Sequence, residues 1–174
     1  MEKFKSPEKL LAFLATKNES FLKPPVDVEK ICSIYDIEIE EKYSNESIVG
    51  KISINDKSSV NIFINLNEND LTSRKRFTIA HELGHFFLHL NEEKNLFQDS
   101  TKTMSRTESY WDPVEAQAND FAARLLMPIE LIIKEAKKLI SEDIDEDIFI
   151  KKLANIFNVS QKAMTYRLKN IGII

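Results

Sequence analysis

Residues 78–89 constrain the chain most, because they read Thr-Ile-Ala-His-Glu-Leu-Gly-His-Phe-Phe-Leu-His and contain the pattern H-E-x-x-H. Positions i and i+4 of an α-helix lie one above the other on the same face. His81 and His85 can therefore direct two imidazoles at one metal ion, and Glu82 can reach a water on that ion without being a ligand. The alternative is a buried helix whose histidines only pack. The surrounding apolar residues predict a helix in either case.

Gly84 lies inside this predicted helix, between the two histidines. Glycine in a helix interior costs up to about 1 kcal/mol relative to alanine. A glycine at this point indicates that another chain segment approaches the helix backbone closely.

Two histidines do not complete a catalytic zinc site, which usually has three protein ligands and a water. The metzincin pattern requires a glycine and a third histidine at positions occupied by Leu88 and Asn91, so that class is excluded. His89 lies two helical turns after His81, but one straight helix cannot wrap three ligands around an ion. We therefore expect His89 to support a ligand, to line the cleft or to pack.

Glu115 is the best candidate for the third ligand. It begins the stretch 115–128, whose many small residues allow a helix to approach the metal helix closely. Asn119 lies on the same face as Glu115 and can accept a hydrogen bond from the free ring N–H of a ligating histidine. The alternative is a solvated carboxylate that the helix dipole stabilises. Three other acids lie nearby, namely Glu108, Asp112 and Asp120.

The pattern of the remaining chain predicts an α+β domain over residues 1–140. Helices are expected from Pro7 to about Thr16 and from Asp27 to Ile34, and strands near residues 37–40, 48–54 and 60–66. We expect these strands to form a small antiparallel sheet, with a hairpin turn at residues 55–58. Thr72 or Ser73 is expected to cap the metal helix. Residues 91–110 lack periodicity and are expected to form a polar loop, which either lines the substrate cleft or is disordered. Two helices then follow, from Asp112-Pro113 and from Pro128.

Residues 141–174 are predicted to form a helical pair that resembles a helix-turn-helix and packs on the same domain. The segment from position 151 onward carries no acid and five basic residues: Lys151, Lys152, Lys162, Arg167 and Lys169. One interpretation is a contact with DNA or with a repressor. The other, which we favour, is a packed pair with a solvated basic face, because five cations on an acidic molecule attract phosphate only weakly.

The composition of the chain limits the cellular compartment and the binding partners that can be expected. The chain has 174 residues with a net charge of −4, so it carries no overall bias toward nucleic acid or an anionic membrane. Cys32 is the only cysteine and cannot form an internal disulfide. The apolar run from Leu10 to Ala15 is too short for a signal peptide or a membrane span. These features predict a cytoplasmic protein without a membrane partner.

Two motifs together resemble the ImmA/IrrE family of small metallopeptidases. One runs from Arg74 to His89, after a strand ending near Asn65, and the other from Glu115 to Pro128. The resemblance covers roughly residues 25 to 170. It implies a zincin-like fold, with Zn²⁺ on His81, His85 and Glu115 and with Glu82 as the base. It also implies a helix-turn-helix repressor as partner, because family members are often encoded on mobile elements and prophages beside a repressor that they inactivate.

Three functional interpretations follow. In the first, the protein is a zinc peptidase in which Glu82 takes a proton from the attacking water and passes it to the leaving amine. Tyr110 and His89 are then candidates for stabilising the oxyanion. In the second, the protein is a non-catalytic regulator with a structural metal and a DNA-binding helical pair. In the third, it is an antitoxin-like module that acts by binding. The presence of Glu82 favours the enzyme, because a structural metal needs no general base.

Overall fold

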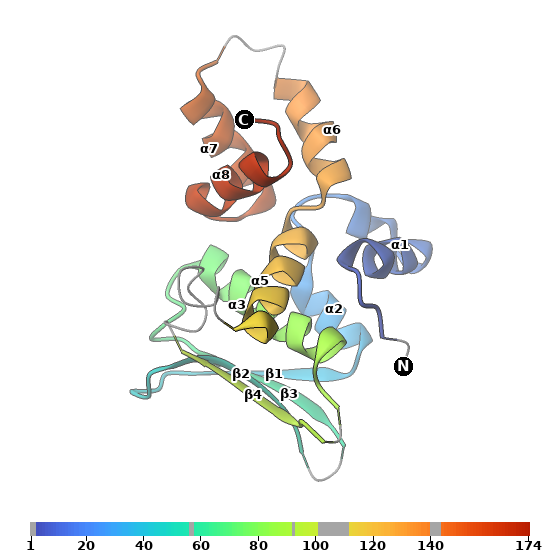
Figure 1. Cartoon of the computed structure of the whole chain (residues 1–174), viewed down its shortest axis with the longest axis vertical. Helices are drawn as coiled ribbons and strands as arrows, with labels where there is room; N and C mark the ends of the chain where they lie inside the picture. The colour runs from blue at the N-terminus through green and yellow to red at the C-terminus, as the bar shows by residue number, and fades with distance from the viewer. Residues whose placement is uncertain (1–2, 56–57, 92, 101–111, 140–143) are drawn as a thin grey trace.

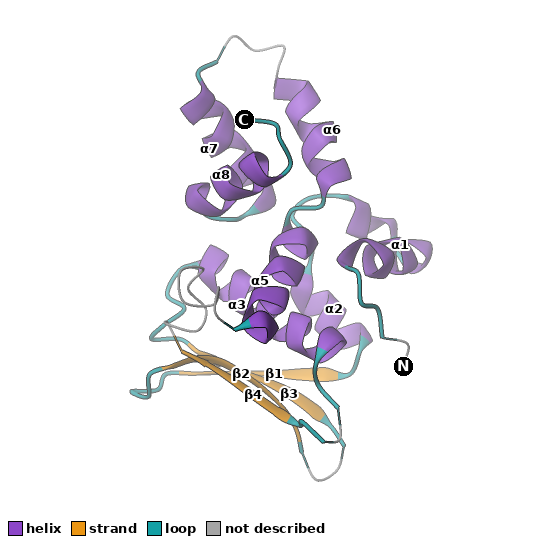
Figure 2. Cartoon of the chain, viewed as in Figure 1, coloured by secondary structure: helices purple, strands orange, loops and turns teal. Residues whose placement is uncertain are grey.

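The computed structural model describes residues 3–55, 58–91, 93–100, 112–139 and 144–174, and in these the helices lie on one side of a four-stranded sheet (Figure 1; Figure 2). This confirms the predicted α+β class. The strands are β1 (Ile37–Lys42), β2 (Ile48–Ile54), β3 (Val60–Asn65) and β4 (Leu96–Ser100). The helices are α1 (Pro7–Lys17), α2 (Val28–Ile34), α3 (Thr72–Leu88), α5 (Pro113–Leu126), α6 (Ile129–Leu139), α7 (Glu146–Phe157) and α8 (Gln161–Asn170), with a short 3-10 helix, η1 (Glu19–Leu22). None of the described helices is long and apolar enough to cross a membrane.

Most helix starts follow from a local side-chain cap. Side chains with an oxygen acceptor bind a free backbone N–H of the first turn. Four helices begin in this way, at Ser6, Asp27, Asp112 and Ser160. The expected cap of α3 by Thr72 or Ser73 was wrong. The residue before α3 is Leu71, and no side chain caps the helix, because both hydroxyl residues already lie within the first turn.

The sheet is mixed, so the expectation of an antiparallel sheet was wrong in part. The strand order is β1-β3-β2-β4, and β1 pairs with β3 in parallel. The predicted hairpin is present, because β2 and β3 are antiparallel and the Ser58 N–H donates to the Asn55 carbonyl at 2.9 Å. The sequence pattern alone predicted a small antiparallel sheet and one hairpin. Instead, the loop that connects β1 to β2 crosses the end of β3, which lies between these two strands in the sheet.

Asn65 explains this crossover. It is the last residue of β3 and its side chain is buried. Its amide oxygen accepts the Ser44 N–H at 3.0 Å, and its amide nitrogen donates to the carbonyls of Ser44 and Ile48 at 3.0 and 2.9 Å. One side chain thus satisfies the backbone of the connecting loop on both sides and holds the loop over the end of β3.

Strand β4 lies within the segment expected to be a polar loop, and this expectation was wrong for residues 96–100. The strand pairs antiparallel with β2 at the end of the sheet order (Figure 1). Phe97 and Asp99 are buried, whereas Leu96 and Gln98 are exposed. The side chains therefore alternate as in a strand with one covered face, and the inward set contains a carboxylate.

Helix α3 packs between the sheet and α5 (Figure 1). The approach to α5 is closest at Gly84, where a Cβ atom would lie 3.0 Å from the Cα and from the carbonyl oxygen of Ala118. This finding confirms that Gly84 admits another segment to the helix backbone. Each helix contributes a small residue at the contact, and the two axes can therefore lie unusually close.

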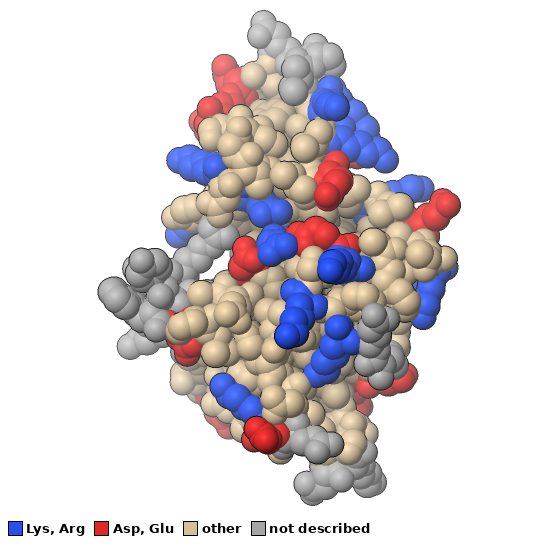
Figure 3. Space-filling view, turned by 45° about the vertical axis from the view of Figure 1, so that its right-hand side comes forward, with Lys and Arg blue, Asp and Glu red and all other residues tan. Residues whose placement is uncertain are grey.

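The C-terminal helices pack on the rest of the chain. Leu153, Phe157 and Leu168 are fully buried and belong to the same apolar core as α3 and α5. The Arg167 Nε donates to the carbonyl of Met127, which follows α5, at 3.0 Å. One of the five basic residues is thus used inside the molecule. On the face drawn in Figure 3, basic and acidic side chains are interspersed.

A partly exposed ion pair joins α1 to α5 and predicts a pH dependence of stability. Arg124 donates from Nε and Nη2 to the two carboxylate oxygens of Glu8, at 2.9 and 2.7 Å. Burial alone would raise the pKa of Glu8, but hydrogen bonds from Arg124 and Ser6 outweigh it and lower the pKa to about 2. The contribution to stability is therefore complete above pH 4.5, the ordinary value, and is lost as the pH falls toward 2.

We expect Glu8→Gln to lower the free energy of unfolding at pH 7 by about 1 kcal/mol or less, because the pair is partly exposed. The difference from the wild type should shrink as the pH is lowered from 4.5 to about 2, where the wild-type carboxylate also loses its charge. Urea unfolding of both proteins across this range measures it. Glu19→Gln, at an exposed position, is the control. A difference that is constant with pH would contradict the assignment to this ion pair.

Candidate metal centre

The two histidines of α3 face the same point. His81 and His85 are fully buried, and their Nε2 atoms lie 3.0 Å apart. The Nδ1 of His81 lies 3.0 Å from the amide oxygen of Asn119, which can only accept, so this nitrogen carries the proton. The Nε2 of His81 can then offer its lone pair to a metal ion at the shared point. The structure thus places the amide of Asn119 against the ring of His81.

Glu115 reaches the same point from the first turn of α5. Its Oε2 lies 3.2 Å from the Nε2 of His81, and its Oε1 lies 3.4 Å from the Nε2 of His85. Two of the three other acids that the sequence analysis named near Glu115 lie in the described part of the chain, and they have different contacts. Asp112 caps α5, and Asp120 forms an ion pair with Arg124. Glu108 lies outside the described residues. Of the acids named from sequence, Glu115 alone is placed at the histidines within the described chain.

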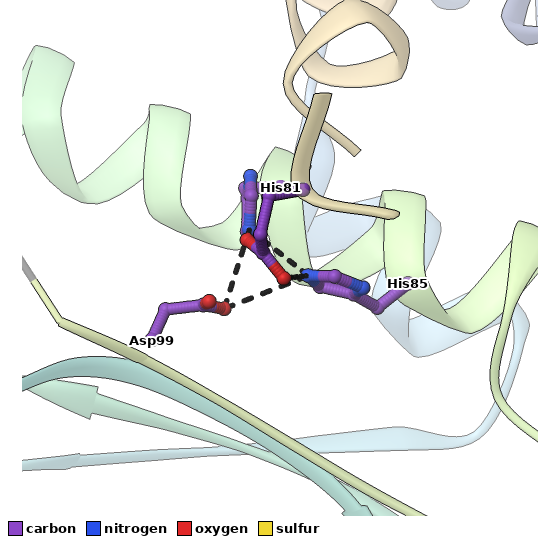
Figure 4. Close-up of side chains that lie close together, drawn as sticks. His81, His85 and Asp99 are labelled. Carbon is purple, nitrogen blue, oxygen red and sulfur yellow. Dashed lines mark hydrogen bonds and ion pairs between the residues drawn. The ribbon is translucent and has the colours of Figure 1, made fainter. Parts of the chain in front are cut away.

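Asp99 is the functional residue that the sequence analysis missed. Its Oδ2 lies 3.2 Å from the Nε2 of His81 and 3.6 Å from the Nε2 of His85. Figure 4 shows this side chain rising from β4 toward both rings. The only sequence signal was the alternation of Phe97 and Asp99 with exposed neighbours. One inward apolar residue is too few to indicate a strand, so the acid could not be assigned to a face.

The four side chains form a group suited to a metal ion. His81, His85, Asp99 and Glu115 each offer a ligand atom, and these atoms all lie within 4.8 Å of one another. All four residues are buried. Carboxylates and imidazole lone pairs that converge away from water are costly unless a cation compensates them. The donor set therefore fits a divalent metal ion that accepts nitrogen and oxygen ligands.

The electrostatics of the group favour positive charge at its centre. Burial alone would lower the pKa of His81, but hydrogen bonds to Asp99 and Glu115 raise it to about 10. Burial would raise the pKa of Asp99, but its contacts with His81 and His85 hold it well below its usual range. The same carboxylates that stabilise a protonated imidazole would stabilise a bound cation in its place.

Glu82 lies beside this centre and is fully buried. Burial and the neighbouring carboxylate of Asp99 raise its pKa well above the usual value. Among the described residues, no N–H or O–H group donates to either of its carboxylate oxygens. A carboxyl group with a raised pKa and free lone pairs is suited to accept a proton and to return it.

Gly50 provides the space for Glu82. This residue lies in β2, and a Cβ atom there would be 2.5 Å from the Oε1 of Glu82 and 2.6 Å from the Cγ2 of Thr78. Both distances are shorter than van der Waals contact. The strand can therefore lie against this part of α3 only because position 50 has no side chain.

A β-bulge in β2 lies next to Gly50, the residue that pairs with Asp99. The register shifts between Ile48 and Gly50, where β2 pairs with Ser100 and Asp99 of β4. Bulges of this kind often redirect a side chain next to a functional site. The carbonyl of Val49, at the bulge, accepts from the Nδ2 of Asn69 at 2.9 Å.

The bulge is connected to α3 through Asn69. Its Oδ1 accepts from the hydroxyl of Thr78 at 2.6 Å. Val49, Asn69 and Thr78, which these hydrogen bonds connect, are all buried. The hydrogen bonds therefore fix the position of the strand relative to the helix that carries the histidines.

The last two sequence candidates differ in outcome. His89 ends α3, and its Nδ1 lies 3.2 Å from the Nδ1 of His85 while its Nε2 lies 3.0 Å from the Oε1 of Gln117. Its ring thus lies between the side chains of His85 and Gln117. Tyr110 lies outside the described residues.

Two histidines one helical turn apart, a glutamate after the first, and acids from two other elements define a metal centre of the metallopeptidase type. Comparison with known proteins agrees. Residues 32–169 match the family model described as the IrrE N-terminal-like domain, a peptidase family. The chain is also 31% identical over 144 residues to Metallopeptidase ImmA of Bacillus subtilis (strain 168), which covers 80% of this chain and 77% of that protein. The chain belongs to this family and is a metallopeptidase, as its motifs predicted.

We expect Gly50→Ala to reduce peptidase activity by about 10²-fold, because the added methyl group displaces the Glu82 carboxylate or separates β2 from α3. Metal content should remain close to the wild-type value, since the three atoms nearest to the added Cβ belong to Glu82 and Thr78, neither of which is a proposed ligand. Activity and bound metal are measured on the same preparation. Lys51→Ala, at the next residue, whose side chain points to the other face, is the control. Full activity in Gly50→Ala would contradict this role for the glycine.

Proposed function

We propose that the protein is a zinc-dependent endopeptidase in which His81, His85 and Glu115 bind the metal and Glu82 is the general base. The observation that carries the proposal is the convergence of Glu115 on the Nε2 atoms of both histidines, at 3.2 and 3.4 Å, beside a buried glutamate. Two nitrogens and a carboxylate are a common ligand set of catalytic zinc.

The residues around the metal have separate tasks. A bound zinc ion supplies Lewis acidity, which acidifies a water and polarises a carbonyl. Glu82 accepts the proton of the attacking water and later donates it to the leaving amine, a transfer that its raised pKa favours. Asn119 holds His81 in the tautomer that leaves Nε2 free for the metal. A non-catalytic regulator would need no such base, and so we favour the enzyme.

The substrate we propose is a specific cytoplasmic protein, a helix-turn-helix transcriptional repressor cut at one or a few sites. The resemblance to the ImmA/IrrE family supports the repressor. The metal centre recognises only a peptide carbonyl, so specificity must come from the surrounding surface. Narrow specificity also agrees with the buried state of the centre, since an unrestricted peptidase would harm the cell that makes it.

We expect Glu82→Gln to keep its fold and its zinc but to lose about 10²–10⁴-fold in cleavage rate, the usual contribution of general-base catalysis. Gln has nearly the same shape but cannot accept the proton. Circular dichroism, zinc content and cleavage of a repressor substrate are measured together. Glu38→Gln, at an exposed position of β1, is the control. Normal cleavage by Glu82→Gln would exclude the proposed mechanism.

Specificity is tested with two substrates. We expect the zinc-loaded protein to leave casein largely intact and to cut the repressor encoded beside its own gene into discrete fragments, in a reaction that a chelator stops. Electrophoresis and mass spectrometry of the fragments identify the sites. Rapid and indiscriminate digestion of casein would contradict narrow specificity. A repressor that is bound but stays intact would favour regulation by binding.

A further inference from the structure

We propose that Asp99 is a fourth protein ligand, which closes the metal centre in the resting enzyme and must leave it before a substrate can bind. The proposal rests on the proposed function, because it assumes that His81, His85 and Glu115 are the other three ligands. It adds an inhibitory role for strand β4, which carries Asp99.

The distances between the four ligand groups carry the proposal. In a tetrahedral zinc site with bonds of 2.0–2.1 Å, any two ligand atoms lie about 3.3 Å apart. The two imidazole nitrogens are separated by 3.0 Å. Glu115 lies 3.2 and 3.4 Å from these nitrogens, and Asp99 lies 3.2 and 3.6 Å from them. Asp99 therefore takes the corner that a catalytic site keeps for water.

The position of Asp99 is built by the fold. The side chain is buried, with 2% of its surface exposed, although it comes from a strand at the end of the sheet. The bulge in β2 sets its register opposite Gly50, and Asn69 holds the bulge to α3. Phe97, two residues earlier, stacks on the ring of His85 with a centroid distance of 4.4 Å. Both inward side chains of β4 thus contact the metal-binding helix.

The arrangement separates a closed state from an active one. With four protein ligands the site has the character of a structural metal centre. Water reaches the metal and the base once Asp99 withdraws, and this exchange breaks no covalent bond. Strand β4 suits the movement, because it is five residues long and, among the described strands, pairs with β2 alone.

The test compares Asp99→Ala and Asp99→Asn with Glu115→Gln, using metal binding and a small probe in addition to activity. Zinc affinity is measured by competition with a chromogenic chelator. The absorption bands of Co²⁺ report replacement of a ligand. Acetohydroxamic acid, which binds metals through two oxygens, reports access to the ion. Gln98→Ala, on the opposite face of β4, is the matched control.

We expect both Asp99 variants to keep one metal ion per chain, with zinc affinity lowered by at least about tenfold, the lower end of the loss for a supporting contact. Their Co²⁺ bands should shift, whereas those of Gln98→Ala should not. Acetohydroxamic acid should bind at least about tenfold more tightly, because less of the protein is in the closed state. Basal cleavage should rise by a similar factor.

Two results would overturn the role of Asp99. Unchanged Co²⁺ bands and unchanged zinc affinity in both variants would show that it is no ligand. A shifted spectrum with lower cleavage and weaker probe binding would show that it is needed in the active state. Failure of the proposed function looks different, since the Co²⁺ bands and the zinc affinity of Glu115→Gln would then be unchanged and activity would survive in Glu82→Gln.

Discussion

The close approach of α3 and α5 at Gly84 and Ala118 is the contact on which the metal centre depends. On α5, Glu115 and Asn119 lie three positions before and one after Ala118, so they share the face turned to α3. On α3, His81 and His85 flank Gly84. A contact between two small residues thus sets the distance between the helices, and the helical repeat then places carboxylate, amide and imidazoles at bonding range.

The polarity of the centre has a thermodynamic consequence for the fold. Three carboxylates, those of Glu82, Asp99 and Glu115, are buried beside two imidazoles. Groups of this kind oppose folding unless opposite charge compensates them, which makes a bound cation part of the stability of the domain. Contacts with the sheet offset this cost on the other side of α3. There the hydrogen bonds of Asn69 and Thr78 and the apolar core hold helix and strand together.

The sequence predicted the α3 half of the centre because its signal is local. A helix places residues four apart on one face, so His81 and His85 could be paired without knowledge of the tertiary structure. Glu115 and Asn119 were proposed because their stretch is rich in small residues and because a spacing of four places both on one helix face. The parallel pairing of β1 with β3 could not be read in the same way, since it depends on the path of a loop that the Asn65 side chain holds. Asp99 was missed because β4 is short and turns only one apolar residue inward.

The pleat of β4 also decides which of its residues could be exchanged without harm. Side chains alternate along a strand, so only the odd or only the even positions reach the metal-binding helix. Exposed positions such as Gln98 lie on the other parity and are free to vary in size and charge. An insertion or deletion of one residue between Phe97 and Asp99 would instead exchange the two sets and turn the carboxylate to solvent. The length of this short strand is therefore under a stricter constraint than its composition. Its sequence resembles that of a loop, so the inward position of Asp99 can be assigned only from the pairing of β4 in the sheet.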